Sequence, residues 1–240
     1  MNNLAFLLFV ANDNQLQQQH MDLKIDTRFY TVQSITSITD HTFIVRVPRK
    51  DLKFRAGQHI SVGIKGESNF REYSVFSGEN ENYLEFLVKE IKTGYFTPRL
   101  RKVRVGQLLD INGPYGKFGI AKDKETTHKH IFIASGTGIA PFHSMVKSNP
   151  SLNYHLIHGV INASEAYARN DFDAARYTLC TSRDGSGNYA GRVTKYLEEN
   201  SFDADTHFYL CGNSKMISDS LEIIKSKGFS RANISAEIYF

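Results

Sequence analysis

The chain has 240 residues, 41% hydrophobic and 22% charged, which is typical of a folded protein with room for two modest domains and excludes a disordered one. Its two cysteines, Cys180 and Cys211, are too few for an iron-sulfur cluster held by four thiolates, and they do not have zinc-ligand spacing. We therefore expect no metal. The net charge of +4 favours acidic partners and phosphates without requiring nucleic acid.

The start of the chain shows no membrane or export signal. Its apolar stretch at 4–11 is far shorter than the roughly 20 residues of a spanning helix and has no basic residue before it, as a signal peptide would. We expect residues 1–21 to be a disordered leader or extension, either natural or added, with Met21 as the alternative start of the folded protein. With so few cysteines, a cytoplasmic location without membrane insertion is expected.

Residues 22–121 have the pattern of a small β domain. Short runs of β-branched and aromatic residues, separated by turn residues, predict six strands and one short helix. Many short strands with few helices favour a six-stranded antiparallel β-barrel. The expected strands are 30–38, 42–47, 59–64, 71–76, 83–90 and 107–111, and the expected helix is 96–103.

Residues 122–240 alternate apolar strands with helical segments, as in an α/β domain whose parallel sheet is covered by helices. The polar stretch 122–129 is suited to a linker, and apolar residues recur at helical spacing in 214–227. The whole chain is therefore predicted to be an α+β protein of two domains, 22–121 and 122–240. The second should contain five parallel strands, at 130–134, 154–160, 177–181, 207–211 and 234–239.

Three short motifs follow one another along the chain. REYS at 71–74 lies on a predicted strand, where Arg71 and Tyr73 share one face and Ser74 points to the other. GTGIAP at 136–141 joins a strand to a helix opened by proline, and its glycines would let the backbone approach a pyrophosphate. CGNSKM at 211–216 ends the fourth parallel strand, at the edge where ligands collect.

The glycine motif departs from the fingerprint of ordinary dinucleotide-binding dehydrogenases. Pro141 stands in place of the third glycine. About 20 residues later, where those enzymes carry an acidic residue, this chain has His158 and Gly159. Together with the ending EIYF at 237–240, the three motifs resemble the ferredoxin-NADP reductase family over about residues 22–240.

The resemblance implies an FAD-dependent oxidoreductase that transfers electrons between NADPH and a ferredoxin or flavodoxin, with hydride transfer at flavin N5. It assigns FAD to the β-barrel, where Arg71 would bind the pyrophosphate, Tyr73 would lie against the isoalloxazine ring and Ser74 would reach N5. The segment containing Gly94, Phe96 and Thr97 would bind the pyrophosphate at the start of a short helix. The family's closing aromatic would cover the flavin, and Tyr239 and Phe240 are the two candidates.

The resemblance assigns NADP to the α/β domain. A hydroxyl beside a guanidinium, as in Ser182 and Arg183, is suited to a 2′-phosphate, and this favours NADPH over NADH. Asp184 complicates that assignment, because it would pair with Arg183 or repel the phosphate. Tyr189 is a candidate for stacking on the adenine ring. The expected NADP-binding residues are Gly136, Thr137, Gly138, Pro141, Ser182, Arg183, Arg192, Gly212 and Met216.

The expected catalytic residues are Ser74, Cys211 and Glu237. In the family that the chain resembles, the matching thiol touches the nicotinamide, so Cys211 would shape the site and would not act as a nucleophile. The alternative is a buried, inert cysteine, which is how we interpret Cys180.

Other functions with similar chemistry stay open at this point. An NAD(P)H-dependent reductase component of an oxygenase and a free-flavin reductase differ only in the electron acceptor. A non-catalytic flavin- or nucleotide-binding subunit would keep the glycine motif but would not need Ser74, Cys211 and a terminal aromatic together. The acceptor is expected to be a separate acidic protein. Its docking surface would include the basic cluster Arg99, Arg101, Lys102 and Arg104, which is otherwise a solvated helix face.

Overall fold

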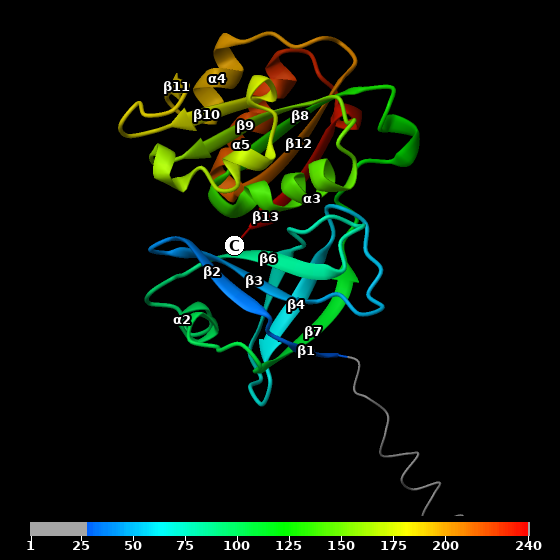
Figure 1. Cartoon of the computed structure of the whole chain (residues 1–240). Helices are drawn as coiled ribbons and strands as arrows, with labels where there is room; N and C mark the ends of the chain where they lie inside the picture. The colour runs from blue at the N-terminus through cyan, green and yellow to red at the C-terminus, as the bar shows by residue number, and fades with distance from the viewer. Residues whose placement is uncertain (1–27, 240) are drawn as a thin grey trace, which may run out of the picture.

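The structure is a computed structural model that describes residues 28–239, so the expectations for 1–21 and for Phe240 lie outside the described residues. The chain forms two stacked halves, with antiparallel sheets in the first and a helix-covered parallel sheet in the second (Figure 1). Within 28–239, no helix has the length and apolar character needed to cross a membrane.

The first half contains seven strands in two antiparallel sheets, so the predicted count of six is wrong. The predicted strand 30–38 is in fact two strands, because the chain crosses from one sheet to the other at Val32 and Gln33. The Val32 N–H donates to the Gln107 carbonyl beside the first sheet, and the Gln33 N–H donates to the Arg46 carbonyl in the second. The two sheets are joined by a bridge between Val75 and Phe86. One sheet has the order β1 (Phe29–Thr31), β7 (Leu108–Tyr115), β4 (His59–Ile64), β5 (Phe70–Ser74), and the other has β2 (Ser34–Thr39), β3 (Thr42–Pro48), β6 (Tyr83–Lys89).

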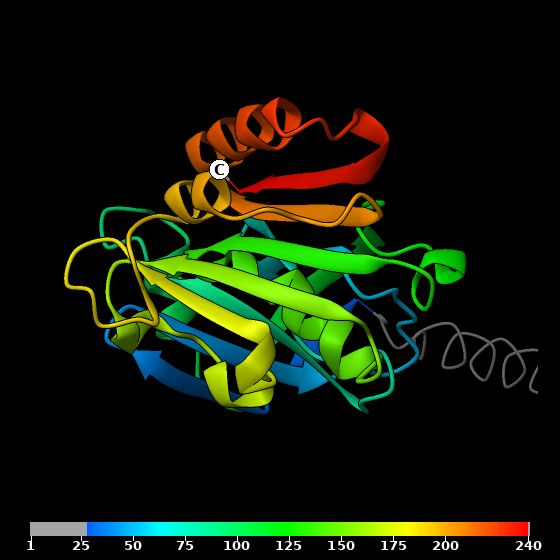
Figure 2. The ribbon, with the colours of Figure 1, turned by 90° about the horizontal axis from the view of Figure 1, so that it is seen from above.

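The second half is built on a parallel sheet of six strands, seen edge to edge in Figure 2, and not on the five that were predicted. The extra strand, β11, has only two residues, too few to show a periodic pattern. The four inner strands of the sheet are largely buried on both faces, which is why they are rich in apolar residues, whereas the edge strand at Ile234–Tyr239 is only partly buried. The sheet order is β11 (Tyr189–Ala190), β10 (Tyr177–Thr181), β9 (Tyr154–Val160), β8 (Lys129–Ser135), β12 (Thr206–Asn213), β13 (Ile234–Tyr239).

Helices cover both faces of the parallel sheet. On one face, α4 (Val193–Glu199) and α5 (Ser214–Ser226) bury apolar residues against β8, β9 and β12. Asn213 caps α5, because its side chain accepts hydrogen bonds from the N–H groups of Lys215 and Met216. On the other face, α3 (Ala140–Ser148) follows the one-turn helix η2 (Gly136–Ile139) and packs between the sheet and the first half.

One of the three hydrophobic clusters within residues 28–239 spans both halves. Phe76 and Leu87 of the first half belong to the same buried cluster as Phe132, Phe142 and other residues of the second. The short helix α2 (Thr97–Arg101) lies in the first half, away from this junction (Figure 1). The halves are therefore fixed to each other by apolar burial, which is the main favourable contribution to folding.

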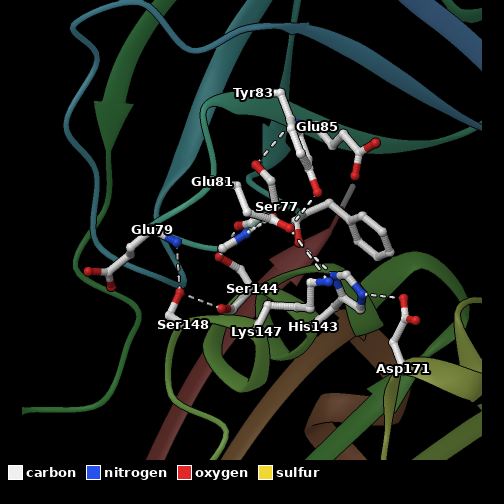
Figure 3. Close-up of polar contacts among 12 residues, drawn as sticks. Ser77, Glu79, Glu81, Tyr83, Glu85, His143, Ser144, Lys147, Ser148 and Asp171 are labelled. Atoms are coloured by element: carbon white, nitrogen blue, oxygen red, sulfur yellow. Dashed lines mark hydrogen bonds and ion pairs between the residues drawn. The ribbon is translucent and has the colours of Figure 1, made fainter.

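A polar network surrounds this core (Figure 3). The ring of His143, on α3, stacks on Phe76 with centroids 3.8 Å apart. Its Nδ1 lies 2.7 Å from the Phe76 carbonyl oxygen and its Nε2 lies 2.9 Å from the Asp171 carboxylate. The His143 ring thus bridges a backbone carbonyl of the first half and a carboxylate of the second. Nearby, Ser144 donates to the Ser77 carbonyl, a second bond across the junction.

Candidate active site

Four side chains from three strands meet where the two halves join. Ser74 ends β5, Cys211 lies near the end of β12, and Glu237 and Tyr239 belong to β13. The Tyr239 hydroxyl donates to Ser74 Oγ at 2.7 Å, and Ser74 donates in turn to Glu237 Oε2 at 3.0 Å. Cys211 pairs with Glu237 in the β12–β13 register. The structure thus brings together the three residues that were predicted to be catalytic.

The protonation states of this cluster are set mainly by burial. Desolvation raises the pKa of the Cys211 thiol well above its usual value, and the neighbouring Glu237 carboxylate raises it further. Desolvation also raises the pKa of Glu237, although the hydrogen bond from Ser74 opposes this shift. A thiol that stays protonated is a poor nucleophile. Cys211 is therefore suited to shape the site and not to attack a substrate.

Sequence reasoning missed His59, whose ring lies next to Glu237 of this cluster. Its Nδ1 lies 3.5 Å from Glu237 Oε1 and its Nε2 lies 3.7 Å from Glu72 Oε2. A single histidine at the start of a strand carries no motif. Its role becomes visible only because β4 and β5 pair with His59 opposite Ser74.

The expected flavin residues lie on β5. Arg71 is exposed, and its guanidinium contacts the Phe70 carbonyl. The Tyr73 ring packs on Phe86 with centroids 5.2 Å apart, and its buried hydroxyl has no hydrogen-bond partner among residues 28–239. A buried hydroxyl without a partner is costly. A polar ligand lying against Tyr73 would supply that partner, so this strand fits FAD.

The segment before α2 fits FAD only in part. Phe96 is 2% exposed and belongs to the core of the first half, so its side chain is not available to a ligand. Thr97 Oγ1 accepts from the Ile91 N–H at 2.8 Å and so holds the loop itself. Gly94 allows the tight turn onto the Ile91 carbonyl. Any contact from Phe96 to the cofactor would have to come from its backbone.

A cleft of about 870 Å³ opens along the carboxyl edge of the parallel sheet, a volume that suits a cofactor-sized ligand. Its walls contain residues from both halves. Among the expected nucleotide residues, it is lined by Gly136, Thr137, Ser182, Arg192, Gly212 and Met216. Tyr239 lines it as well, so the cleft reaches the cluster around Ser74.

Other expected nucleotide residues do not line this cleft. Gly138 and Pro141 are buried behind it, and a Cβ on Gly138 would lie 2.2 Å from the Cys211 carbonyl oxygen, so this close packing requires glycine. Arg183 is exposed outside the cleft. The Tyr189 ring packs edge-on against Tyr196 and its hydroxyl donates to Glu199, which argues against stacking on adenine.

The residue that complicated coenzyme choice has a local role. Asp184 accepts hydrogen bonds from the backbone N–H and the hydroxyl of Ser186, and these bonds keep its pKa below the usual value. Three charged residues that sequence reasoning missed, Lys89, Glu165 and Asp219, also line the cleft. Lys89 ends β6 in the first half, so only the packing of the two halves brings it there.

The basic cluster near α2 is partly neutralised within the molecule. Arg99 is held by Glu67, at 2.7 to 3.1 Å. Arg101 bonds to Ser37 Oγ at 2.8 Å and lies over the Phe43 ring. Lys102 and Arg104 are exposed. Half of the predicted docking surface is therefore committed to internal contacts.

Comparison with known families gives two matches along the chain. The model of the oxidoreductase FAD-binding domain matches residues 20–120, and that of the oxidoreductase NAD-binding domain matches residues 132–222. The first half, with β5, and the second half, with the cleft, each match a ligand-binding domain of that description.

Individual relatives include electron transfer proteins. The toluate 1,2-dioxygenase electron transfer component of Pseudomonas putida is 25% identical over 223 residues, which are 86% of this chain and 66% of the relative. The probable dihydroorotate dehydrogenase B (NAD(+)) electron transfer subunit of Pyrococcus furiosus is 31% identical over 78% of this chain and 70% of its own length. The ferredoxin NADP+ reductase structure from Neisseria gonorrhoeae with bound FAD and NADP shares the fold, with a TM-score of 0.78, 22% identity, and coverage of 89% of this chain and 99% of that one.

Proposed function

Because this chain belongs to the ferredoxin-NADP reductase family of FAD- and NAD(P)-binding oxidoreductases, we propose that it transfers electrons between NADPH and a separate ferredoxin or flavodoxin. One observation carries this proposal. Ser74 from the flavin half and Cys211, Glu237 and Tyr239 from the nucleotide half meet at the end of a single cleft. A protein that only binds a nucleotide would not need this convergence.

The protein's contribution would be orientation and exclusion of water. When bound, FAD would supply the redox chemistry by accepting hydride at N5 and releasing electrons singly. Arg71 would bind its pyrophosphate, and Tyr73 would lie against its ring. Cys211, protonated and buried, would fix the position of the nicotinamide.

Tyr239 would occupy the nicotinamide's place until the coenzyme arrives. Its hydroxyl is bonded to Ser74, and it lines the cleft, so an incoming nicotinamide would break that bond. Ser74 would keep its hydrogen bond to Glu237, which positions the hydroxyl near the reacting atoms. A cytoplasmic setting is proposed because both cysteines are unpaired.

The direct test is steady-state reduction of purified ferredoxins, flavodoxins and free flavins, each with NADPH and with NADH. The proposal expects a protein acceptor and NADPH to give the highest kcat/KM. Activity confined to free flavin would contradict it. The second candidate is the reductase component of an oxygenase. The toluate dioxygenase relative favours it, and so do the bonds of Arg99 to Glu67 and of Arg101 to Ser37, because they leave fewer free cations for an acidic ferredoxin. Rapid reduction of an oxygenase and slow reduction of ferredoxin would establish that alternative.

Arg71→Ala should weaken FAD binding by about ten- to a hundredfold, because it removes a charge-assisted hydrogen bond worth roughly 1.5 to 3 kcal/mol. Flavin content after dialysis, and the Kd from fluorescence titration, measure the loss. Arg71→Lys is the control, since lysine keeps the charge but lacks the planar guanidinium. Its Kd for FAD should lie between those of wild type and Arg71→Ala. Wild-type affinity in Arg71→Ala would remove Arg71 from the flavin site.

Coenzyme choice should depend on residues that face the cleft. Ser182→Ala combined with Arg192→Ala should raise KM for NADPH much more than KM for NADH, because a hydroxyl and a guanidinium are lost from a wall facing the 2′-phosphate. Arg183→Ala is the matched control, since Arg183 is exposed outside the cleft, and its effect should be smaller. Equal losses with both coenzymes in the double variant would show that these residues do not distinguish the 2′-phosphate.

Acceptor docking should depend on Lys102 and Arg104, the exposed part of the basic cluster. Reversing both to glutamate should slow reduction of an acidic ferredoxin or flavodoxin and flatten its salt dependence, while reduction of ferricyanide stays unchanged. The control replaces Lys122 and Lys124, on the connection between the halves, with glutamate, which makes the same change of net charge at a different place on the surface. If both double variants slow the acceptor equally, the effect comes from net charge and not from docking.

A further inference from the structure

A histidine that no motif explains lies behind the glycine loop of the cleft. His158, on β9, is fully buried. Its Nε2 lies 2.9 Å from the carbonyl oxygen of Gly136, and its Nδ1 lies 2.7 Å from the hydroxyl of Tyr177, the first residue of β10. One side chain thus connects the loop that follows β8 to the neighbouring strand on the other side.

These contacts define the tautomer of His158. A carbonyl oxygen can only accept, so Nε2 carries the proton and donates to Gly136. Nδ1 then accepts from the Tyr177 hydroxyl, which is itself buried. Burial lowers the pKa of His158 to about 4, so the ring is neutral at physiological pH and both nitrogens are satisfied.

The orientation of the Gly136 carbonyl controls the next N–H group. In a trans peptide, the C=O of one residue and the N–H of the next point in opposite directions. The bond between Gly136 and Thr137 is trans, since the cis bond within 28–239 is Gly113–Pro114. With the carbonyl held by His158 behind the loop, the Thr137 N–H points the other way. Gly136 has a φ of +54°, a conformation that glycine adopts without strain.

Gly136 and Thr137 both line the cleft whereas His158 does not, so the side of the loop away from His158 faces the cleft. Thr137 belongs to the first turn of η2, where N–H groups have no partner within the turn. We infer that His158 is a positioning residue, which holds the Gly136 carbonyl so that the Thr137 N–H is aimed at the pyrophosphate of the bound coenzyme. This inference rests on the proposed function, because it requires a dinucleotide in the cleft.

Two substitutions separate this role from mere packing. Phenylalanine keeps the ring volume but cannot donate, whereas glutamine places an N–H donor close to the position of Nε2. With the FAD-loaded protein in a calorimeter, His158→Phe should raise the Kd for NADP+ by roughly ten- to a hundredfold, the worth of one hydrogen bond to a charged group. His158→Gln should stay within about threefold of wild type. Adenosine 2′-phosphate, which lacks the pyrophosphate, should bind all three proteins equally.

Kinetics give a second readout. A hydrogen bond made equally in the ground state and the transition state changes KM and leaves kcat nearly unchanged. His158→Phe should therefore raise KM for NADPH in ferricyanide reduction with little loss of kcat. His155→Gln is the matched control, because His155 lies on the same strand and bonds to Thr178 of β10, but is not part of the cleft wall. Its Kd and KM should remain those of wild type.

The inference fails if His158→Phe binds NADP+ as wild type does, if adenosine 2′-phosphate is weakened as much as NADP+, or if glutamine restores nothing. Should His158→Phe not fold, Tyr177→Phe tests the same chain of contacts, since it removes the donor that fixes the tautomer. Tyr177→Phe should raise the Kd for NADP+ and leave the Kd for adenosine 2′-phosphate unchanged. If the variant binds both ligands with the wild-type Kd, the inference is wrong. A wild-type protein that binds no dinucleotide would instead refute the proposed function.

Discussion

Acidification from pH 7 to pH 5 is expected to lower the free energy of unfolding by about 4 kcal/mol, because two buried histidines remain neutral in the folded protein. The pKa of His130 and that of His158 are each lowered to about 4, in both cases mainly by desolvation. The ring nitrogens of His130 make no well-formed hydrogen bond among the described residues, and the nearby backbone of Glu125 and Lys124 offsets only part of the desolvation cost of charging the ring.

The direction follows from proton linkage. An unfolded histidine titrates near pH 6.5, so between about pH 6.5 and 4 the unfolded state binds more protons than the folded state. Stability therefore falls as the pH is lowered, by about 1.4 kcal/mol per pH unit for each histidine, and is flat above about pH 6.5. Glu237 acts in the opposite sense, because its raised pKa lets the folded state take up a proton first.

Urea unfolding at several pH values measures this slope. His130→Leu removes one of the two titrating groups while keeping the site apolar, so its stability should change about half as much between pH 7 and pH 5. His41→Leu is the control, because it makes the same replacement at an exposed position. A wild-type slope in His130→Leu would show that His130 is not held neutral.

Replacing Cys211 with alanine should slow reduction of the bound flavin by up to about a hundredfold, because a shift of the nicotinamide on the order of 1 Å can cost that much. Cys211 is 0% exposed beside Glu237 and Tyr239, so the loss of its sulfur enlarges the site at the point where the rings must align. Rapid mixing with NADPH measures the rate directly, and the flavin content should not change.

Cys180→Ala is the matched control for that experiment. Cys180 is equally buried and also lies in the cleft wall, but it is on β10, two strands away from β8 and three away from β12, and is not part of the cluster around Ser74. Its replacement should cost stability, as any cavity does, and leave the rate of flavin reduction near that of wild type. If both cysteine variants lower the rate by the same factor, the effect reflects general loosening and Cys211 is a packing residue.

Most of the strands could be predicted because apolar runs and alternation are local signals. The strands at 154–160, 177–181 and 234–239 have the predicted bounds. The strand counts were wrong for reasons that no local pattern reveals. The chain changes sheets in the middle of an unbroken β-like run at Val32, and β11 forms only because a two-residue segment meets the edge strand β10.

The candidate site was predictable where a motif marked it. Ser74, Cys211 and Glu237 carry sequence signals and meet in the structure. His59 and Lys89 reach the site and the cleft by strand pairing and by packing of the halves, so isolated residues gave no signal. Phe96 shows the reverse case, since its neighbours match a motif while its side chain belongs to the core of the first half.

The core that runs through both halves bears on how such a protein can be rearranged by gene fusion. Phe76 and Leu87 on one side, and Phe132 and Phe142 on the other, bury one another, so either half alone would present this apolar surface to water. A recombination event that moved only one half would release an aggregation-prone fragment. The unit that a gene fusion can transfer intact is therefore the pair of halves, inherited together.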